Sequence, residues 1–383
     1  MTQIQSRTAL AARLSAHIGR LPSVVIGFDG FVDEMIRVVE ERKSLDHYTP
    51  VSSIRMFGSH VMRAAGHSSL REIVVTAVHP GGCAVNMGDG LASLGVPVDA
   101  FATLGTPPHP AFASITHRFR STHSWGREPG RTLAYEFEDG KLMFSSVNQL
   151  AELTPGKATS LLADGAYAAA CRQAGLIALT DWTLYPHMTA VWSLLQRDIY
   201  RHLEHRPTFF IDLVDPSGRS APDIRAMLDV LPGFECAGPL TLGLNGNEAN
   251  ILSRMLDLPE CTDDRPETSK LLAETLRRRL GISEVVIHHV KSAAVAGPDG
   301  AAAIFGPYCE KPRQSTGAGD RFNAGYALGQ LLRLTPLERL LCACANSGFF
   351  VREARSASFV ELADFMANSG WGIEPLNAPE VYR

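Results

Sequence analysis

Short apolar runs that alternate with helical segments constrain the fold of this chain more than any other feature. Beyond residue 150, strand-like runs lie at 175–180, 208–214, 240–244 and 284–289, and stretches with apolar residues at helical spacing separate them. Strands spaced in this way by helices pair in parallel within one sheet. We therefore predict an α/β fold with a doubly wound, mostly parallel sheet flanked by helices.

A hairpin signal interrupts this pattern in the first half of the chain. Alternating residues flank the turn sequence Glu138-Asp139-Gly140, which is typical of a β-hairpin. We predict a small β-sheet lid built from residues of about 33–45 and 98–146. No repeat, charge block or low-complexity linker divides the sequence, so we expect a single domain over residues 1–383.

Composition argues against several classes of partner. Hydrophobic residues make up 45% of the 383 residues and charged residues 20%, as in ordinary globular proteins. A net charge of -4 gives no electrostatic case for binding nucleic acid or an anionic membrane. The absence of such a charge bias favours a small ligand. No segment approaches the roughly 20 apolar residues of a membrane span. Seven scattered cysteines suggest reduced thiols rather than a disulfide framework, and hence a cytoplasmic protein.

The glycine-rich turn Gly317-Ala318-Gly319-Asp320 predicts an anion site. Small residues let the backbone approach a ligand, and the apolar pattern that follows indicates that a helix begins here. A helix start offers unpaired amides and a partial positive charge. A carboxylate at a phosphate-binding helix start is unfavourable unless a base or a metal ligand is needed there, which makes Asp320 a candidate for one of these roles. The alternatives are a dinucleotide fingerprint in an unusual position and a turn that only caps a packed helix.

Two other junctions carry polar residues at predicted strand ends. Asp29 and Asp33 follow the first strand, and ligands of open α/β sheets gather outside such ends. For Asp29, ordinary Asp-Gly turn chemistry is an equal alternative. The pair Gly81-Gly82 allows close backbone approach and feeds a helix whose first turn presents Asn86, which can recognise hydroxyl groups. These residues are candidates for binding a polar substrate.

Asn245 and Glu248 lie three residues apart at the start of another predicted helix. They fall on the same side of its first turn, where they could position waters around Mg²⁺. The same spacing is that of a capping box, which needs no ligand and is the more frequent arrangement.

Together these motifs resemble those of the ribokinase-like PfkB carbohydrate kinases. Their order and approximate spacing agree from about residue 24 to 355. The resemblance rests on three groups: Gly81-Gly82 with Asn86 and Leu94-Gly95; Asn245 with Glu248; and Gly317-Ala318-Gly319-Asp320 with Phe322 and Ala324-Gly325. It implies an ATP- and Mg²⁺-dependent kinase that phosphorylates a hydroxymethyl or other alcohol group of a sugar or sugar-like substrate.

The resemblance also implies roles for the residues of the glycine-rich turn and of the nucleotide site. Asp320 would be the general base, and the amides of Gly317, Ala318 and Gly319 would hold the charge of the transferred phosphoryl group. Asn245 and Glu248 would then organise Mg²⁺ and the nucleotide phosphates, and Asn346 would lie beside the adenine.

On the substrate side, the resemblance implies that Asp33, Gly82 and Asn86 hold the sugar hydroxyls, with Asp29 as a further candidate. The hairpin would form part of the substrate lid, and the family often pairs through its lids, so a homodimer is possible. A nucleoside kinase of the same family is an alternative. A sugar-binding or regulatory homologue without catalysis is another.

Two positions depart from the family pattern. Gln314-Ser315 stands where the family usually has Asp-Thr, so activation by a monovalent cation is an open question. The family's Thr-x-Gly nucleotide turn would fall near His288-His289-Val290-Lys291, which lacks the glycine. Lys291 could reach a nucleotide phosphate there, or it could be an ordinary exposed lysine.

Overall fold

A nine-stranded sheet forms the centre of the molecule in the computed structural model, which describes residues 3–15, 21–368 and 371. Most neighbouring strands are parallel, and only the last two strands at one edge run antiparallel to their neighbours. The predicted sheet is therefore confirmed. The strands, in their order across the sheet, are β14 (Gly300–Phe305), β13 (Ser292–Gly297), β12 (Glu284–His288), β11 (Leu240–Asn245), β10 (Thr208–Asp212), β9 (Ala174–Thr180), β1 (Ser23–Phe28), β5 (Val98–Ala102) and β6 (Ser121–Ser124).

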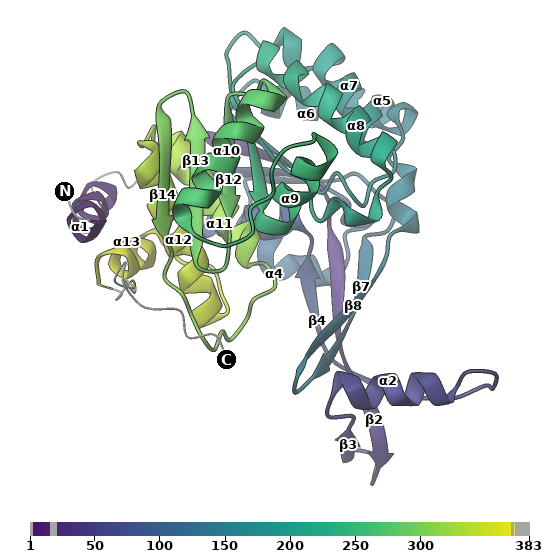
Figure 1. Ribbon diagram of the computed structural model, residues 1–383. Helices are drawn as coiled ribbons and strands as arrows, with labels where there is room; N and C mark the ends of the chain where they lie inside the picture. The colour runs from purple at the N-terminus through teal and green to yellow at the C-terminus, as the bar shows by residue number, and fades with distance from the viewer. Residues whose placement is uncertain (1–2, 16–20, 369–370, 372–383) are drawn as a thin grey trace.

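Helices cover both faces of this sheet and form two separate apolar cores (Figure 1). Six helices pack on one face: α5 (Pro155–Leu162), α6 (Ala166–Cys171), α7 (Met188–Asp198), α8 (Ala221–Val230), α9 (Gly246–Met255) and α10 (Pro266–Leu280). The other face carries α1 (Gln3–Ser15), α3 (Cys83–Ser93), α4 (Ala113–Thr116), α11 (Ala318–Leu331), α12 (Pro336–Glu353) and α13 (Phe359–Asn368). Because both faces are covered, the central strands are continuous apolar runs rather than alternating ones.

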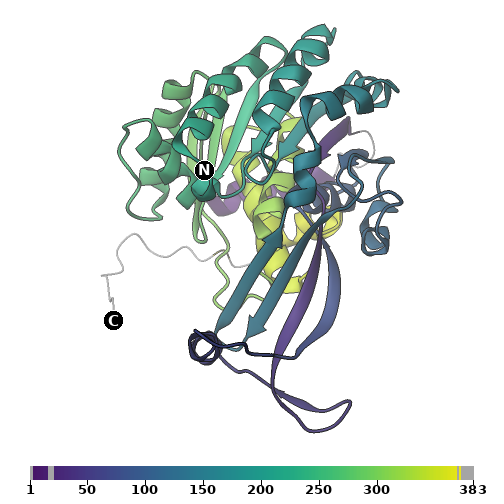
Figure 2. The same cartoon turned by 90° about the vertical axis from the view of Figure 1, so that its right-hand side faces the viewer.

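A second sheet projects from the main body (Figure 2). It contains β3 (Tyr48–Pro50), β2 (Phe31–Arg42), β7 (Gly130–Phe137) and β8 (Gly140–Ser146), with β4 (Ile73–Gly81) paired to β2. Helix α2 (Ile54–Arg63) lies at its far end, where Phe57 packs near Tyr135 and Phe137. This projecting sheet is the lid.

The lid differs from the predicted ranges in two ways. The predicted segment 98–146 begins too early, because β5 and β6 belong to the main sheet. Every residue of β5 is buried, as a central strand requires, whereas the lid strand β8 is largely exposed. The lid also includes β3 and β4, which lie outside both predicted segments and pair with β2.

Candidate active site

Asp320 is buried in the first turn of helix α11, at the edge where the parallel strands end. Gly317 precedes this helix with a φ of 88°, a left-handed conformation that favours glycine. Burial raises the pKa of Asp320 to about 7; neighbouring Arg321 opposes this rise, while the charges of Asp212 and Asp29 add to it. The carboxyl group therefore exchanges a proton near neutral pH.

One of the three amides predicted to bind an anion, that of Ala318, already forms a hydrogen bond within the glycine-rich turn. Backbone N–H of Ala318 donates to the Ser315 carbonyl at 3.1 Å, so this amide has a partner inside the turn. Gly319 lies in the wall of a large cavity, and a Cβ added to it would meet the His288 ring at 3.5 Å.

Asp29 supports the glycine turn from below, which corrects its predicted role as a substrate contact. It is 1% exposed. Its carboxylate accepts hydrogen bonds from the amides of Cys83 and Ala84, the latter at 2.9 Å, and from the Thr180 hydroxyl at 2.6 Å. A carboxylate with three donors at the start of α3 acts as a cap. Asp29 thus fixes the turn at Gly82 and does not face a ligand.

Asp33 and Asn86 remain candidates for substrate contact. Asp33 lies at the base of the lid, opposite Thr132, and its Oδ1 is buried without a hydrogen-bond partner among the described residues. Burial raises the pKa of Asp33. Asn86 is partly exposed in the first turn of α3, and its Nδ2 lies 3.7 Å from the position that a Cβ on Gly317 would occupy. Asn86 therefore stands beside the glycine-rich turn.

Asn245 and Glu248 form the capping box that their spacing allowed. Backbone N–H of Asn245 donates to Glu248 Oε2 at 2.8 Å, and Glu248 N–H donates to Asn245 Oδ1 at 2.9 Å. Asn245 Nδ2 also donates to Glu248 Oε1 at 2.7 Å. Burial raises the pKa of Glu248 to about 8, and the charge of Asp212 contributes to this rise.

Asp212 and Cys83 are site residues that the sequence analysis missed. Asp212 ends strand β10 and accepts from Asn323 Nδ2 at 2.6 Å, and its charge raises the pKa of both Asp320 and Glu248. The Cys83 thiol lowers the pKa of Asp320 slightly, against the effect of burial. The signal for Asp212 was available, because it is an acidic residue at the carboxyl end of a buried strand, as Asp29 nearly is.

A cavity of about 420 Å³ opens next to the start of α11. Its polar end contains Asn245, Gly319 and the side chains of His288 and His289. Its apolar lining includes Val290, Pro307, Pro312, Cys344, Gly348 and Val351. The cavity has a predominantly apolar lining with a few polar groups at one end, as is common in small-molecule sites.

Two predicted nucleotide contacts lie outside this cavity. Asn346 is fully buried and donates from Nδ2 to the Arg321 carbonyl at 2.7 Å. The next residue, Ser347, lines the cavity instead, because one step along a helix turns a side chain by about 100°. Lys291 is exposed, and its Nζ lies 5.2 Å from the centre of the Tyr308 ring. Neither residue contacts this cavity in the structure, so their roles as nucleotide contacts stay predictions.

His288 and His289 supply the wall where Lys291 was expected. The His288 ring lies against Phe322, with centroids 4.8 Å apart, and burial lowers its pKa to about 4. His289 lies against Gly246, where a Cβ would come within 2.3 Å of the ring. Burial lowers the pKa of His289 too, and its Nε2 has no partner within the part of the chain that the structure describes. Both imidazoles are therefore uncharged at neutral pH.

Comparison with known proteins identifies the family. The family model for prokaryotic ketohexokinase matches residues 5–369. The chain belongs to the prokaryotic ketohexokinase family. It is a carbohydrate kinase, and the resemblance to ribokinase-like kinases is confirmed. A ketohexokinase of Haloferax volcanii is 28% identical over 346 residues, which cover 89% of this chain and 90% of that protein.

Solved structures share the fold of this ketohexokinase family member. A ribokinase from Thermotoga maritima aligns with a TM-score of 0.61 at 15% identity and covers 91% of this chain and 100% of its own. A carbohydrate kinase from Agrobacterium tumefaciens aligns with a TM-score of 0.60 at 15% identity, over 90% and 97% of the two chains.

No helix among the described residues has the length and apolar character needed to cross a membrane.

Proposed function

We propose that this ketohexokinase family member transfers the γ-phosphoryl group of ATP to a hydroxymethyl group of a ketohexose, with Asp320 as the general base. The observation that carries the proposal is the buried Asp320 carboxyl group, whose pKa is about 7, at the start of a helix beside a cavity. A general base is most effective when its pKa lies near the working pH.

Proton transfer to Asp320 accompanies attack by the sugar. The hydroxyl oxygen forms a new bond to the γ-phosphorus, its proton passes to the Asp320 carboxylate, and the bond from phosphorus to the bridging oxygen breaks to release ADP. Phosphoryl transfer demands mainly positioning and charge stabilisation. The amides of Gly317 and Gly319, at the positive end of α11, would supply that stabilisation, and Ala318 would join them if its contact with Ser315 opened.

The large cavity would hold the nucleotide. Its apolar end, between Pro307 and Val351, offers a surface for the adenine, and its polar end leads toward the first turns of α9 and α11. These helix starts attract phosphate groups. His289, with an unpaired Nε2, is a further candidate to donate a hydrogen bond to a phosphate.

Asn245 and Glu248 would position Mg²⁺ through water. Their oxygen atoms already accept hydrogen bonds within the capping box, so direct ligation would break that cap. Nowhere in residues 3–15, 21–368 and 371 do three or more His, Cys, Asp or Glu side chains form a group suited to a metal ion. This arrangement suits a hydrated ion carried by the nucleotide, as Mg²⁺ prefers. When bound, Mg²⁺ would neutralise phosphate charge.

Asp33 and Asn86 would hold the ketohexose. The buried Oδ1 of Asp33 has no partner in the described structure, so a sugar hydroxyl would satisfy an otherwise costly group. Asn86, in α3, lies beside the turn at Gly317. The sugar would therefore lie between the base of the lid and Asp320.

The lid would also join two chains. Val78 and Phe144 lie on one face of its sheet, in register through Glu34 and Leu133, and are 47% and 53% exposed. Exposed apolar groups on one face favour association. Analytical ultracentrifugation should find a dimer, and Phe144→Lys should shift it toward monomer. A wild-type protein that stays monomeric at every concentration would remove this part of the proposal.

The kinase proposal is tested by replacing Asp320 with asparagine. Loss of a general base should lower turnover of fructose by about 10² to 10⁴ while nucleotide binding is retained. ADP release measures turnover, and calorimetry measures nucleotide affinity. Asp223→Asn, on the exposed surface of α8, is the matched control and should leave turnover unchanged.

Two outcomes would contradict the proposal. Unchanged turnover in Asp320→Asn would exclude the base. Fructose binding without ADP release by the wild-type protein would instead indicate a binding protein, and a preference for adenosine over fructose would indicate a nucleoside kinase.

A further inference from the structure

A second cavity, of about 230 Å³, lies where the parallel strands of the main sheet begin, at the opposite ends of the strands from Asp320. Thr241 and Glu284, in the first two residues of β11 and β12, contribute to its wall, whereas the active site lies at the other ends of these strands. Gln330 of α11 also lines it, ten residues after Asp320 on the same helix. The cavity is therefore distinct from the proposed catalytic site.

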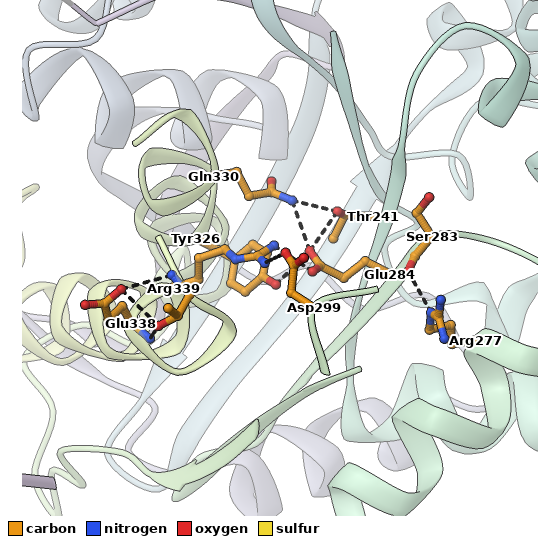
Figure 3. Close-up of polar contacts among 10 residues, drawn as sticks. Thr241, Arg277, Ser283, Glu284, Asp299, Tyr326, Gln330, Glu338 and Arg339 are labelled. Atoms are coloured by element: carbon orange, nitrogen blue, oxygen red, sulfur yellow. Dashed lines mark hydrogen bonds and ion pairs between the residues drawn. The ribbon is translucent and has the colours of Figure 1, made fainter. Parts of the chain in front are cut away.

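Glu284, in the wall of this cavity, accepts hydrogen bonds from four side chains (Figure 3). Its Oε1 accepts from the Tyr326 hydroxyl at 2.7 Å, and from the Thr241 hydroxyl and Gln330 Nε2 at 3.0 Å each. Its Oε2 accepts from Arg339 at 2.6 Å. This carboxylate has no need of a further partner, and Arg339 balances its charge.

Arg339, in contrast, has unused hydrogen-bonding capacity. Its side chain is 9% exposed and forms part of the cavity wall. One terminal nitrogen donates to Glu284, the other reaches Asp299 at 3.3 Å, and Nε has no partner within the described residues. Gln330 Oε1 is also buried without a partner there. Buried polar groups without partners are costly, so they point to a ligand or water.

Arg333 brings a second cation to the same cavity. It is exposed at the end of α11, lines the cavity and forms no ion pair within the described part of the chain. Glu284 already balances Arg339 at 2.6 Å. The second acidic residue in the wall, Asp299, has a side chain that is 70% exposed and makes the longer of the two contacts with Arg339. An anion placed between the two arginines would compete with Asp299 for Arg339.

We propose that this cavity binds a small hydroxylated anion, in which one carboxylate or phosphate group lies between Arg333 and Arg339. Guanidinium groups suit both acidic groups, because their planar donors match the oxygen atoms. Hydroxyl groups on the ligand would pair with the polar side chains of Thr208 and Ser283 in the wall. The apolar contribution comes from Pro239, Pro298 and Leu334.

Calorimetry with glycerol 3-phosphate and with glycerate tests the proposal, and glycerol is the uncharged control. The titrations contain a saturating non-hydrolysable ATP analogue, so that the proposed nucleotide site does not compete for the probes. If that site failed to bind the analogue, the variants below would still decide the question. The expected result is saturable binding of one or both charged probes and none of glycerol.

Three variants locate the binding. Arg333→Ala, at an exposed position, should weaken it by about tenfold, which corresponds to the loss of about 1.4 kcal/mol. Asp299→Asn should strengthen it, because it removes the competing carboxylate. Arg225→Ala, an exposed arginine on α8, should change nothing. The proposal is overturned if neither charged probe binds, if glycerol binds equally well, if Arg333→Ala has no effect or if Asp299→Asn weakens binding.

Discussion

Helix α11 links two groups of buried carboxylates that differ in how they are paired. At its start, Asp320 lies near Asp212 and Glu248, and none of the three forms an ion pair within the described residues. Near its end, Glu284 has an ion pair with Arg339 and three further donors. The first arrangement raises the pKa values of Asp320 and Glu248 and leaves the three carboxyl groups without a counter-charge. The second stabilises the fold.

Replacing Arg339, the cation that pairs with Glu284, should have the largest effect on the free energy of unfolding. Arg339→Met leaves Glu284 buried without a counter-charge, so the free energy of unfolding should fall by about 3–5 kcal/mol. Asp320→Asn should cost little or no stability, because it removes a carboxyl group that burial already disfavours in its charged form. Urea unfolding measures both.

Arg225→Met is the exposed control for this pair and should change stability by less than about 0.5 kcal/mol. If Asp320→Asn were as destabilising as Arg339→Met, the two ends would not differ in the way we describe.

The sequence alone indicated the proposed catalytic start of α11 better than the paired end. Asp320, Asn245 and Asn86 lie in short local motifs, so the neighbouring residues in the sequence identify them as candidates. Glu284 and Arg339 carry no such signal, because their partners come from separate strands and helices and meet only in the folded chain.

The differences between the predicted and the observed surroundings of the candidate site have the same origin. Asp29 and Asp33 both follow the first strand, but only tertiary contacts make Asp29 a cap and leave Asp33 Oδ1 unpaired. Asn346 is buried, whereas the next residue, Ser347, lines the cavity. A sequence motif does not show which of two neighbouring helix residues faces the cavity. The sheet was predictable because its strands are long apolar runs. The lid range was not, because strand partners are set by the fold.

A smaller effect, on the KM for ATP, is expected from replacing His289 in the wall of the large cavity near the start of α11. His289→Ala should raise the KM for ATP by about tenfold or more, because a hydrogen bond to a charged group contributes about 1.5–3 kcal/mol. Lys291→Ala is the matched control and should change KM by less than about twofold, since this exposed side chain lies outside the cavity. Steady-state kinetics with varied ATP measures both. The reverse ranking would restore Lys291 as the phosphate contact.

The dependence of kcat/KM on pH tests the central claim most directly. Because burial raises the pKa of Asp320 to about 7, the carboxyl group is protonated below that pH and cannot accept the hydroxyl proton. We predict that kcat/KM for fructose falls about tenfold for each pH unit below about 7, and that Asp320→Asn lacks this acid limb. A wild-type profile that stays flat from pH 8 to pH 5.5, or an acid limb that persists in Asp320→Asn, would contradict the assignment of Asp320 as the base.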